Sequence, residues 1–206
     1  MTWQQQSGAA KRHAPATQRN RAPLLAVLRE TLPRQGLALE VASGTGEHAA
    51  YFAPALAPLV WQPSDPNPEL RASIAAHAAE AACETLRPPL DLDAGAAAWP
   101  IAEADAVVCI NMIHIAPWRA AEGLLAGAGR LLPAGGPLIL YGPFVVAGET
   151  AESNRAFDAS LKAQNPEWGL RALEEVAEAA GRHGLELTGT HAMPANNLSV
   201  VFRRTR

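Results

Sequence analysis

Short apolar runs alternate with longer segments of helical character along most of this sequence. The runs expected to form strands are 37–41, 59–62, 88–91, 105–111 and 137–141. The segments expected to form helices are 23–35, 47–57, 69–82, 117–132, 152–164 and 172–183. Strands joined by crossover helices pair in parallel and carry helices on both faces of their sheet. The alternation therefore predicts a doubly wound α/β fold.

The end of the chain breaks this alternation. The last two runs, 185–190 and 198–203, are separated only by residues 192–197. That connection is too short for a crossover helix, so we expect the final strand to be antiparallel. The prediction is a seven-stranded, mostly parallel sheet that ends in an antiparallel hairpin, which is the plan of Rossmann-like class I methyltransferases.

The 206 residues suit one domain. We expect that domain at 22–206, with a helical insertion at about 145–170. We expect residues 1–21 to form a basic arm, because they contain no acidic residue; the first one in the sequence is Glu30. The arm is either loose or folded over the active site.

Composition narrows the class of protein. The net charge of −3 argues against a general nucleic-acid binder. The sequence shows no apolar leader and no stretch of roughly 20 apolar residues, so we expect a cytoplasmic protein without a membrane span. Neither the two cysteines nor any cluster of His, Asp and Glu has metal-ligand spacing, so no metal is expected.

Polar residues and glycines follow four of the expected strands, at Glu40–Gly46, Asp65, Asp91 and Asn111. Ligands of open α/β sheets bind at the carboxyl ends of the strands. Gly44 and Gly46 allow a positive φ and a close backbone approach to a ligand. These positions therefore predict a cofactor site.

Two cofactors suit a glycine turn of this kind. Gly44–Ala49 also fits the GxGxxA pattern of nicotinamide enzymes, with Asp65 standing 19 residues after Gly46. Glu40 decides between them, because its carboxylate would repel an anionic pyrophosphate. S-adenosylmethionine carries a cationic sulfonium and an ammonium group instead, so we predict S-adenosylmethionine as the cofactor.

Each cofactor residue has an expected role. Glu40 meets the amino-acid end of the cofactor, Asp65 the ribose hydroxyls, and Asp91 the adenine amino group. Asp65 is also a candidate helix cap, and Asp93 is an alternative to Asp91. The full predicted set is Glu40, Ser43, Gly44, Gly46, Asp65, Asp91, Leu92, Asn111 and Met112.

Eight segments carry a resemblance to a known family. They are 14–20, 39–48, 61–65, 110–118, 141–144, 153–158, 168–171 and 193–197. Over nearly its whole length the chain resembles an uncharacterised methyltransferase-like family that includes animal methyltransferase-like protein 26. The resemblance implies the class I fold and cofactor binding but supplies no substrate. Ala172 departs from the family pattern, which has Asp at that position, so any role of that Asp is in doubt here.

The methyl acceptor is expected on the far side of Asn111. His114 is a candidate general base, although a structural histidine is the alternative. The absence of the Pro-Pro and Pro-Cys motifs argues against amino-methylating DNA enzymes and cytosine-C5 enzymes. The predicted substrate residues are Arg19, Asn20, Tyr141, Phe144, Asn154, Phe157, Asp158, Arg171, Asn196 and Asn197. Asn196 and Asn197 also suit an ordinary turn.

Three functions are compatible with these patterns. The first is methylation of a small polar molecule, with catalysis resting chiefly on orientation. The second is a non-catalytic binding or interaction protein, because no acid–base pair is evident. The third is methylation of a protein or nucleic acid, which the basic arm would favour.

Overall fold

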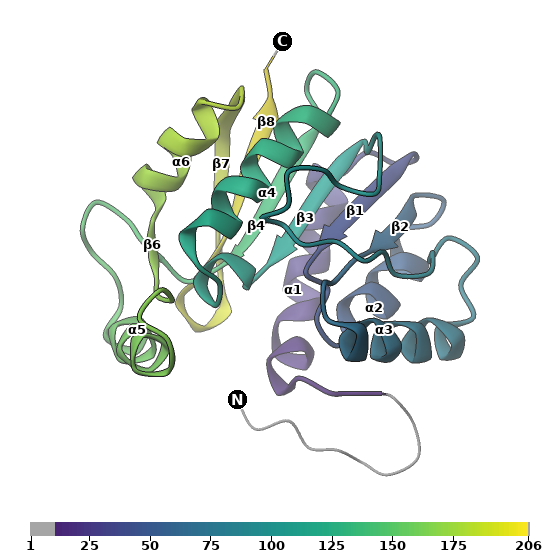
Figure 1. Ribbon diagram of the computed structural model, residues 1–206, viewed down its shortest axis with the longest axis horizontal. Coiled ribbons are helices and arrows are strands. Elements are labelled where there is room, and N and C mark those ends of the chain that lie inside the picture. Colours follow the sequence, from purple (N-terminus) through teal and green to yellow (C-terminus); the bar gives the residue numbers. More distant parts are fainter. Residues whose placement is uncertain (1–10, 206) are drawn as a thin grey trace.

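A six-stranded sheet forms the centre of the protein, whose computed structural model describes residues 11–205 (Figure 1). The strands are β1 (Leu37–Val41), β2 (Val60–Pro63), β3 (Ala106–Ile110), β4 (Pro137–Gly142), β7 (Leu185–Met193) and β8 (Asn197–Arg204). Their order is β2-β1-β3-β4-β8-β7. The first four are parallel, and β8 is antiparallel to both β4 and β7. The predicted doubly wound sheet with a terminal hairpin is confirmed.

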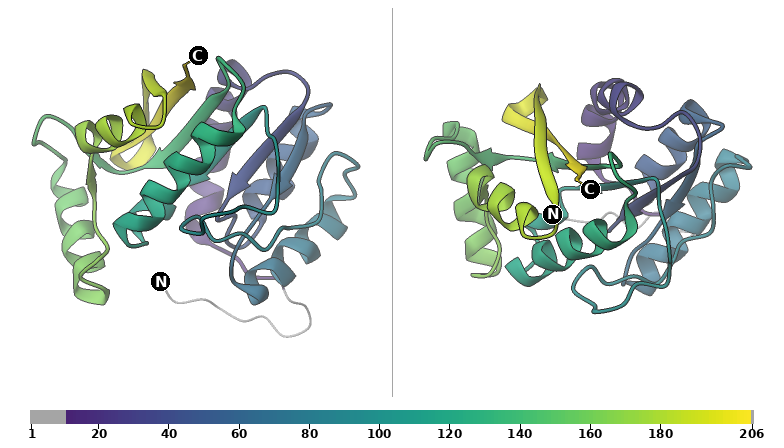
Figure 2. Two further views of the ribbon diagram at one scale, coloured as in Figure 1. Left: turned by 45° about the horizontal axis from the view of Figure 1, so that its top comes forward. Right: turned by 90° about the horizontal axis from the view of Figure 1, so that it is seen from above.

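Helices cover both faces of this sheet (Figure 2). They are α1 (Pro15–Thr31), α2 (Glu47–Leu56), α3 (Pro68–Ala81), α4 (Trp118–Leu131), α5 (Glu152–Gln164) and α6 (Leu173–Gly181). Helices α1 and α2 pack on one face, over a buried cluster that includes Phe52 and Trp61. Helices α4 and α6 pack on the other face. No helix within residues 11–205 combines the length and apolarity that a membrane span requires.

Four short elements lie outside the main sheet, at the edge where its parallel strands end. Two single-turn 3-10 helices, η1 (Met112–His114) and η2 (Pro194–Asn196), follow β3 and β7. The short strands β5 (Phe144–Val145) and β6 (Arg171–Ala172) pair with each other on either side of α5. Helix α5 lies between β5 and β6 in the sequence and apart from the main sheet in space (Figure 1).

Helix α1 begins earlier than expected. The prediction of a start near Pro23 was wrong, because the helix begins at Pro15 and contains Pro23. A proline is well placed in a first helical turn, where its missing N–H has no partner to lose. The buried residues of the early turns are Thr17 and Asn20, which are polar, so apolar periodicity does not mark these turns. Residues 15–21 are therefore helical, and residues 1–10 of the expected arm lie outside the described part.

The expected strand at 88–91 does not form, which leaves six strands in the sheet rather than seven. Only two isolated parallel bridges, Trp61 to Leu86 and Ser64 to Leu90, join this part of the chain to the edge strand β2 and the residue that follows it. Pro88 and Pro89 lack the N–H groups that a ladder needs.

Candidate functional site

The loop between β1 and α2 turns on two glycines that face different surroundings. Gly44 has φ of 58°, and a Cβ added to it would meet no atom within 4 Å. Gly46 has φ of 89°, and a Cβ there would lie 2.6 Å from the Cα of Ile74 on α3. Gly46 therefore serves the packing of α2 against α3, whereas Gly44 leaves open space above the loop.

Glu40 lies at the end of β1 with 1% of its surface exposed. Its Oε2 accepts a hydrogen bond of 2.9 Å from Nε1 of Trp61. Burial raises the pKa of Glu40 to about 7, although the bond from Trp61 opposes the shift. A buried carboxyl of this kind is stabilised as an anion by a nearby cation.

Asp65 ties the end of β2 to the glycine loop. Its carboxylate accepts hydrogen bonds from the backbone N–H of Gly44, at 3.1 Å, and of Asn67, at 2.9 Å. Burial raises the pKa of Asp65 above its ordinary value, against the lowering effect of these bonds. The cap of α3 is Asn67, whose side chain accepts from the backbone of Glu69, so the alternative of Asp65 as that cap is wrong.

The remaining cofactor candidates differ in exposure. Ser43 is buried, and its hydroxyl accepts from the backbone N–H of Ser64 at 3.1 Å. Leu92 and Met112 lie in the core cluster under α4. Asp91 has 70% of its side chain exposed and pairs with Arg71 at 2.9 Å. Asp91 therefore lies at the surface, in an ion pair that a bound ligand would have to share.

The segment before α1 is fastened to the same loop. The backbone N–H of Ala14 donates to Glu47 at 2.6 Å, and that of Arg12 donates to the Ser73 hydroxyl at 2.8 Å. Ser73 in turn donates to the carbonyl of Thr45 at 2.8 Å. Ion pairs of Lys11 with Glu80 and of Arg12 with Glu69 add to these contacts. Residues 11–14 thus contact both α2 and α3, and Ser73 connects them to the loop.

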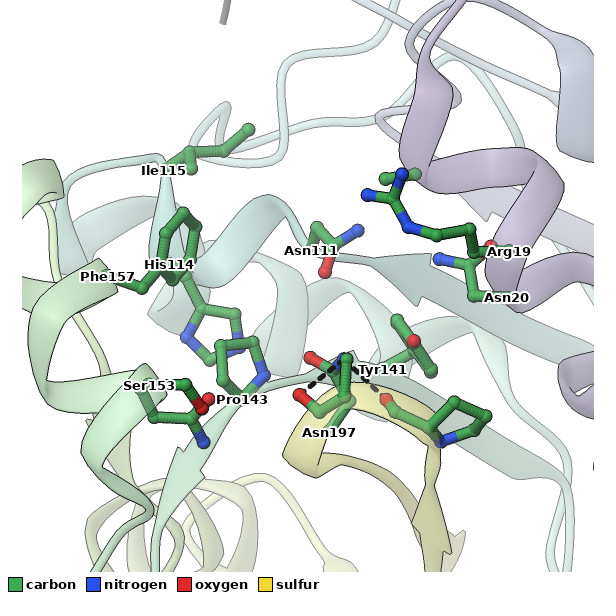
Figure 3. Close-up of a pocket in the computed structure, with 14 residues that line it drawn as sticks. Arg19, Asn20, Asn111, His114, Ile115, Tyr141, Pro143, Ser153, Phe157 and Asn197 are labelled. Carbon is green, nitrogen blue, oxygen red and sulfur yellow. Dashed lines mark hydrogen bonds between the residues drawn. The ribbon is translucent and has the colours of Figure 1, made fainter.

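A cavity of about 370 Å³ opens beside Asn111, beyond the carboxyl ends of β3 and β4 (Figure 3). Its walls come from the start of α1, from η1, from the end of β4, from α5 and from η2. The lining residues are Ala16, Arg19, Asn20, Asn111, His114, Ile115, Tyr141, Pro143, Ser153, Asn154, Phe157, Pro194, Ala195 and Asn197. Eight of the predicted site residues are thus brought together here: Arg19, Asn20, Asn111, His114, Tyr141, Asn154, Phe157 and Asn197.

His114 lines this cavity with only 1% of its surface exposed. Within residues 11–205, neither of its ring nitrogens has a hydrogen-bond partner. The ring packs edge-on against Phe144 at 5.0 Å, and a Cβ on Gly142 would lie 2.4 Å from Nε2. Burial lowers the pKa of His114 to about 3, and the nearby charge of Arg171 adds to the shift. The imidazole is therefore neutral and has a free donor and a free acceptor.

A second histidine, His48, supports the opposite wall and was not predicted from the sequence. Its Nε2 lies 2.8 Å from Oδ1 of Asn20. Burial lowers the pKa of His48 to about 4, so the ring is neutral and its Nε2–H donates to the amide oxygen. This bond leaves the NH2 group of Asn20 beside the hydroxyl of Tyr141. Other lining residues missed from the sequence are Ala16, Ile115, Pro143, Ser153, Pro194 and Ala195.

Four predicted substrate residues do not line the cavity, and the structure corrects their placement. Asp158 accepts from the backbone of Leu170 at 2.8 Å. The guanidinium of Arg171 donates to the carbonyls of Ile113, Ala116 and Glu167 at 2.8–3.0 Å. Phe144 packs behind His114, and Asn196 donates to the Ser153 hydroxyl at 3.0 Å. These side chains hold the surrounding segments in place, because each is engaged by protein groups.

Solved structures of methyltransferases are similar to this fold. The S-adenosylmethionine-dependent methyltransferase SibL, in its apo form, matches 93% of this chain and 56% of its own at 22% identity, with a TM-score of 0.78. An O-methyltransferase family protein from Burkholderia thailandensis matches 89% and 56% at 17% identity, with a TM-score of 0.76. Human N-acetylserotonin methyltransferase in complex with S-adenosylmethionine matches 90% and 55% at 15% identity, with a TM-score of 0.71.

These similarities establish the fold as that of a Rossmann-like class I methyltransferase. The chain spans just over half the length of each of these proteins. Residues 11–204 of this chain match the family described as "Protein of unknown function (DUF938)". The match takes in nearly every residue that the structure describes, and the chain therefore belongs to this family.

Proposed function

We propose that this protein is an S-adenosylmethionine-dependent methyltransferase that acts on a small polar molecule. The observation that carries the proposal is a buried carboxylate at the end of β1, Glu40, beside a loop whose Gly44 faces open space. Asn111 links this loop region to the cavity, because it directly follows β3, the strand next to β1, and lines the cavity wall. The relation to methyltransferase-like protein 26 stays a prediction.

The residues present fit the chemistry of this cofactor. Glu40 and Asp65 are carboxylates, and a cationic ligand favours their ionised forms. An anionic pyrophosphate in the same place would be repelled by both. Glu40 would hold the amino-acid end, Asp65 the ribose, and Asp91 the adenine edge, with Leu92 and Met112 as apolar neighbours. The loop glycines and Ser43 would supply the close backbone approach, and the similarity to a structure solved with S-adenosylmethionine supports this assignment.

When bound, the cofactor would supply an electrophilic methyl group, whose bond to the sulfonium sulfur would break to leave the neutral thioether of S-adenosylhomocysteine. The neutral imidazole of His114 would accept a hydrogen bond from the acceptor's hydroxyl or amine and take its proton as the new bond to carbon forms. Asn111 would orient the acceptor, with Asn20 and Asn197 as further polar contacts. Positioning would carry most of the rate, because an imidazole that resists protonation is a weak base.

Calorimetry with S-adenosylhomocysteine tests the cofactor step on the full chain. We expect binding in the micromolar range or tighter, and at least a tenfold loss in Glu40→Gln, whose neutral amide cannot pair with the ligand's ammonium group. The matched control is Glu103→Gln, which removes one carboxylate from the connection before β3. No heat at high micromolar ligand contradicts the proposal.

A second candidate, a non-catalytic binding protein, is favoured by the low pKa of His114. Incubation with methyl-labelled cofactor and a metabolite extract separates the two. A labelled product that forms with the wild type and falls at least tenfold with His114→Phe supports the enzyme. Cofactor binding without any labelled product supports the second candidate, and label that stays with macromolecules supports methylation of a protein or nucleic acid.

A further inference from the structure

Among the described residues that line the cavity beside Asn111, one side chain is charged, the guanidinium of Arg19. No Asp or Glu is among its lining residues, and the other polar groups are amides, hydroxyls and the neutral imidazole of His114. A bound cofactor would add a second positive charge at the edge of this cavity. A cationic acceptor would therefore be repelled by Arg19 and by the sulfonium group of the cofactor, whereas an anionic acceptor would be attracted by both.

Arg19 is poised to receive such an anion. It projects from the second turn of α1 into the space opposite His114, with Asn111 between the two (Figure 3). Within residues 11–205, no carboxylate lies within ion-pairing distance of its guanidinium, although six pairs between an arginine and a carboxylate form elsewhere. Arg21, two residues on, stacks over the ring of Tyr51 and does not line this cavity.

The opposite end of the cavity, at His114, is suited to bind a hydroxyl or an amine. His114 is buried with both ring nitrogens unpartnered, which costs free energy unless a ligand or water supplies the missing bonds. Six of the lining residues are apolar: Ala16, Ile115, Pro143, Phe157, Pro194 and Ala195. The volume of about 370 Å³ lies within the range of small-molecule sites.

We propose that the methyl acceptor is a small hydroxy acid with an apolar, ring-sized body. Its carboxylate pairs with Arg19, its body lies against the apolar walls, and its hydroxyl meets His114 and Asn111. This inference rests on the proposed function and adds the charge and shape of the acceptor. An anion at Arg19 also has a rival source, the carboxylate of the cofactor itself, and the experiment must separate the two.

The first test measures binding to the full chain saturated with S-adenosylhomocysteine. The probes are 4-hydroxybenzoate and 6-hydroxy-2-naphthoate, their neutral methyl esters, and the amine tyramine. We expect at least one acid to bind roughly tenfold more tightly than its ester, and tyramine to bind most weakly. Acids that bind no better than their esters or the amine overturn the proposal.

Variants on α1 locate the preference. Arg19→Gln is expected to reduce the acid-to-ester ratio to about one while the Kd for S-adenosylhomocysteine changes less than about twofold. The matched control is Arg29→Gln, which removes the same charge from the exposed last turn of the same helix. If Arg19→Gln instead weakens S-adenosylhomocysteine and keeps the ratio, Arg19 belongs to the cofactor and the proposal is wrong.

The extract experiment gives an independent answer that does not depend on the choice of probe. The labelled product is applied to an anion-exchange column at neutral pH, where a methylated hydroxy acid is retained. Label that passes through, or that is retained only by a cation exchanger, contradicts an acidic acceptor. Failure of S-adenosylhomocysteine to bind would instead refute the proposed function, so the two failures are distinguishable.

Discussion

Alanine at each loop glycine should separate the roles of Gly44 and Gly46. Both residues have positive φ, which costs a non-glycine residue about 1–2 kcal/mol. At Gly44 nothing lies within 4 Å of the added methyl, so the backbone penalty is the whole cost. At Gly46 the methyl would lie 2.6 Å from backbone of Ile74, which cannot rotate away. Overpacking adds about 1–3 kcal/mol, so Gly46→Ala should lose about 2–5 kcal/mol in total.

Thermal and urea unfolding measure these losses. At about 2–4 °C per kcal/mol for a domain of this size, Gly44→Ala should lower Tm by a few degrees and Gly46→Ala by about 10 °C. The second readout is calorimetry with S-adenosylhomocysteine on the folded variants. Gly44→Ala should bind at least tenfold more weakly, because its methyl occupies the open space assigned to the cofactor.

Two results would refute this reasoning. Equal stability of the two variants would show that α3 does not press on the loop at Gly46. Wild-type affinity in Gly44→Ala would show that the open space above Gly44 is not the cofactor site. A change at Gly135, which also has positive φ and open surroundings but lies in the turn before β4, is the matched control and should leave affinity unchanged.

Three further predictions concern buried charges. Because the folded pKa of Glu40 is raised to about 7, wild-type stability should fall by about 3 kcal/mol as pH rises from 4.5 to 7, and Glu40→Gln should lack this slope in urea titrations. Affinity for S-adenosylhomocysteine should rise over the same interval, since its ammonium group favours the ionised carboxylate. Burial alone would raise the pKa of Glu47, but hydrogen bonds from Ala14 and His13 lower it overall. The ionised Glu47 therefore stabilises the fold above pH 4.5, and this stabilisation is lost as the pH falls below that value. Glu47→Gln should cost about 2 kcal/mol at pH 7 and should speed proteolysis before α1. Arg171→Lys should lose about 2 kcal/mol in urea unfolding, because a single ammonium cannot serve three carbonyls at once, and an unchanged midpoint would show that those bonds contribute nothing.

Much of the fold could be predicted because burial leaves a pattern in the sequence. The apolar run at 106–110 is buried on both faces as β3, and the short link before Asn197 forces the antiparallel hairpin. The prediction of a strand at 88–91 was wrong because it followed the order of apolar and polar residues, whereas two prolines in this segment lack the N–H groups that strand pairing needs. Helix α1 was placed too late because its early turns bury Thr17 and Asn20 rather than apolar side chains.

The spacing of residues along a helix also could not show which side chains line the cavity and which ones hold neighbouring segments in place. Asn154, Phe157 and Asp158 share one face of α5, yet only the first two line the cavity. Asp158 is drawn to the backbone of Leu170, a contact between distant segments that no local pattern encodes. His48 was missed for the same reason, because its partner Asn20 lies 28 residues away.

The two halves of the site therefore come from different parts of the architecture. The cofactor loop belongs to the alternating sheet, so its acids and glycines follow strands that the sequence marks clearly. The acceptor cavity is walled by elements outside that alternation: the start of α1, the inserted α5 and the turn η2. Side chains there meet a ligand rather than a core, so hydrophobic periodicity does not constrain them. Under the proposed function, a fold shared with known methyltransferases would keep one cofactor, while these added walls, Arg19 among them, would set the acceptor.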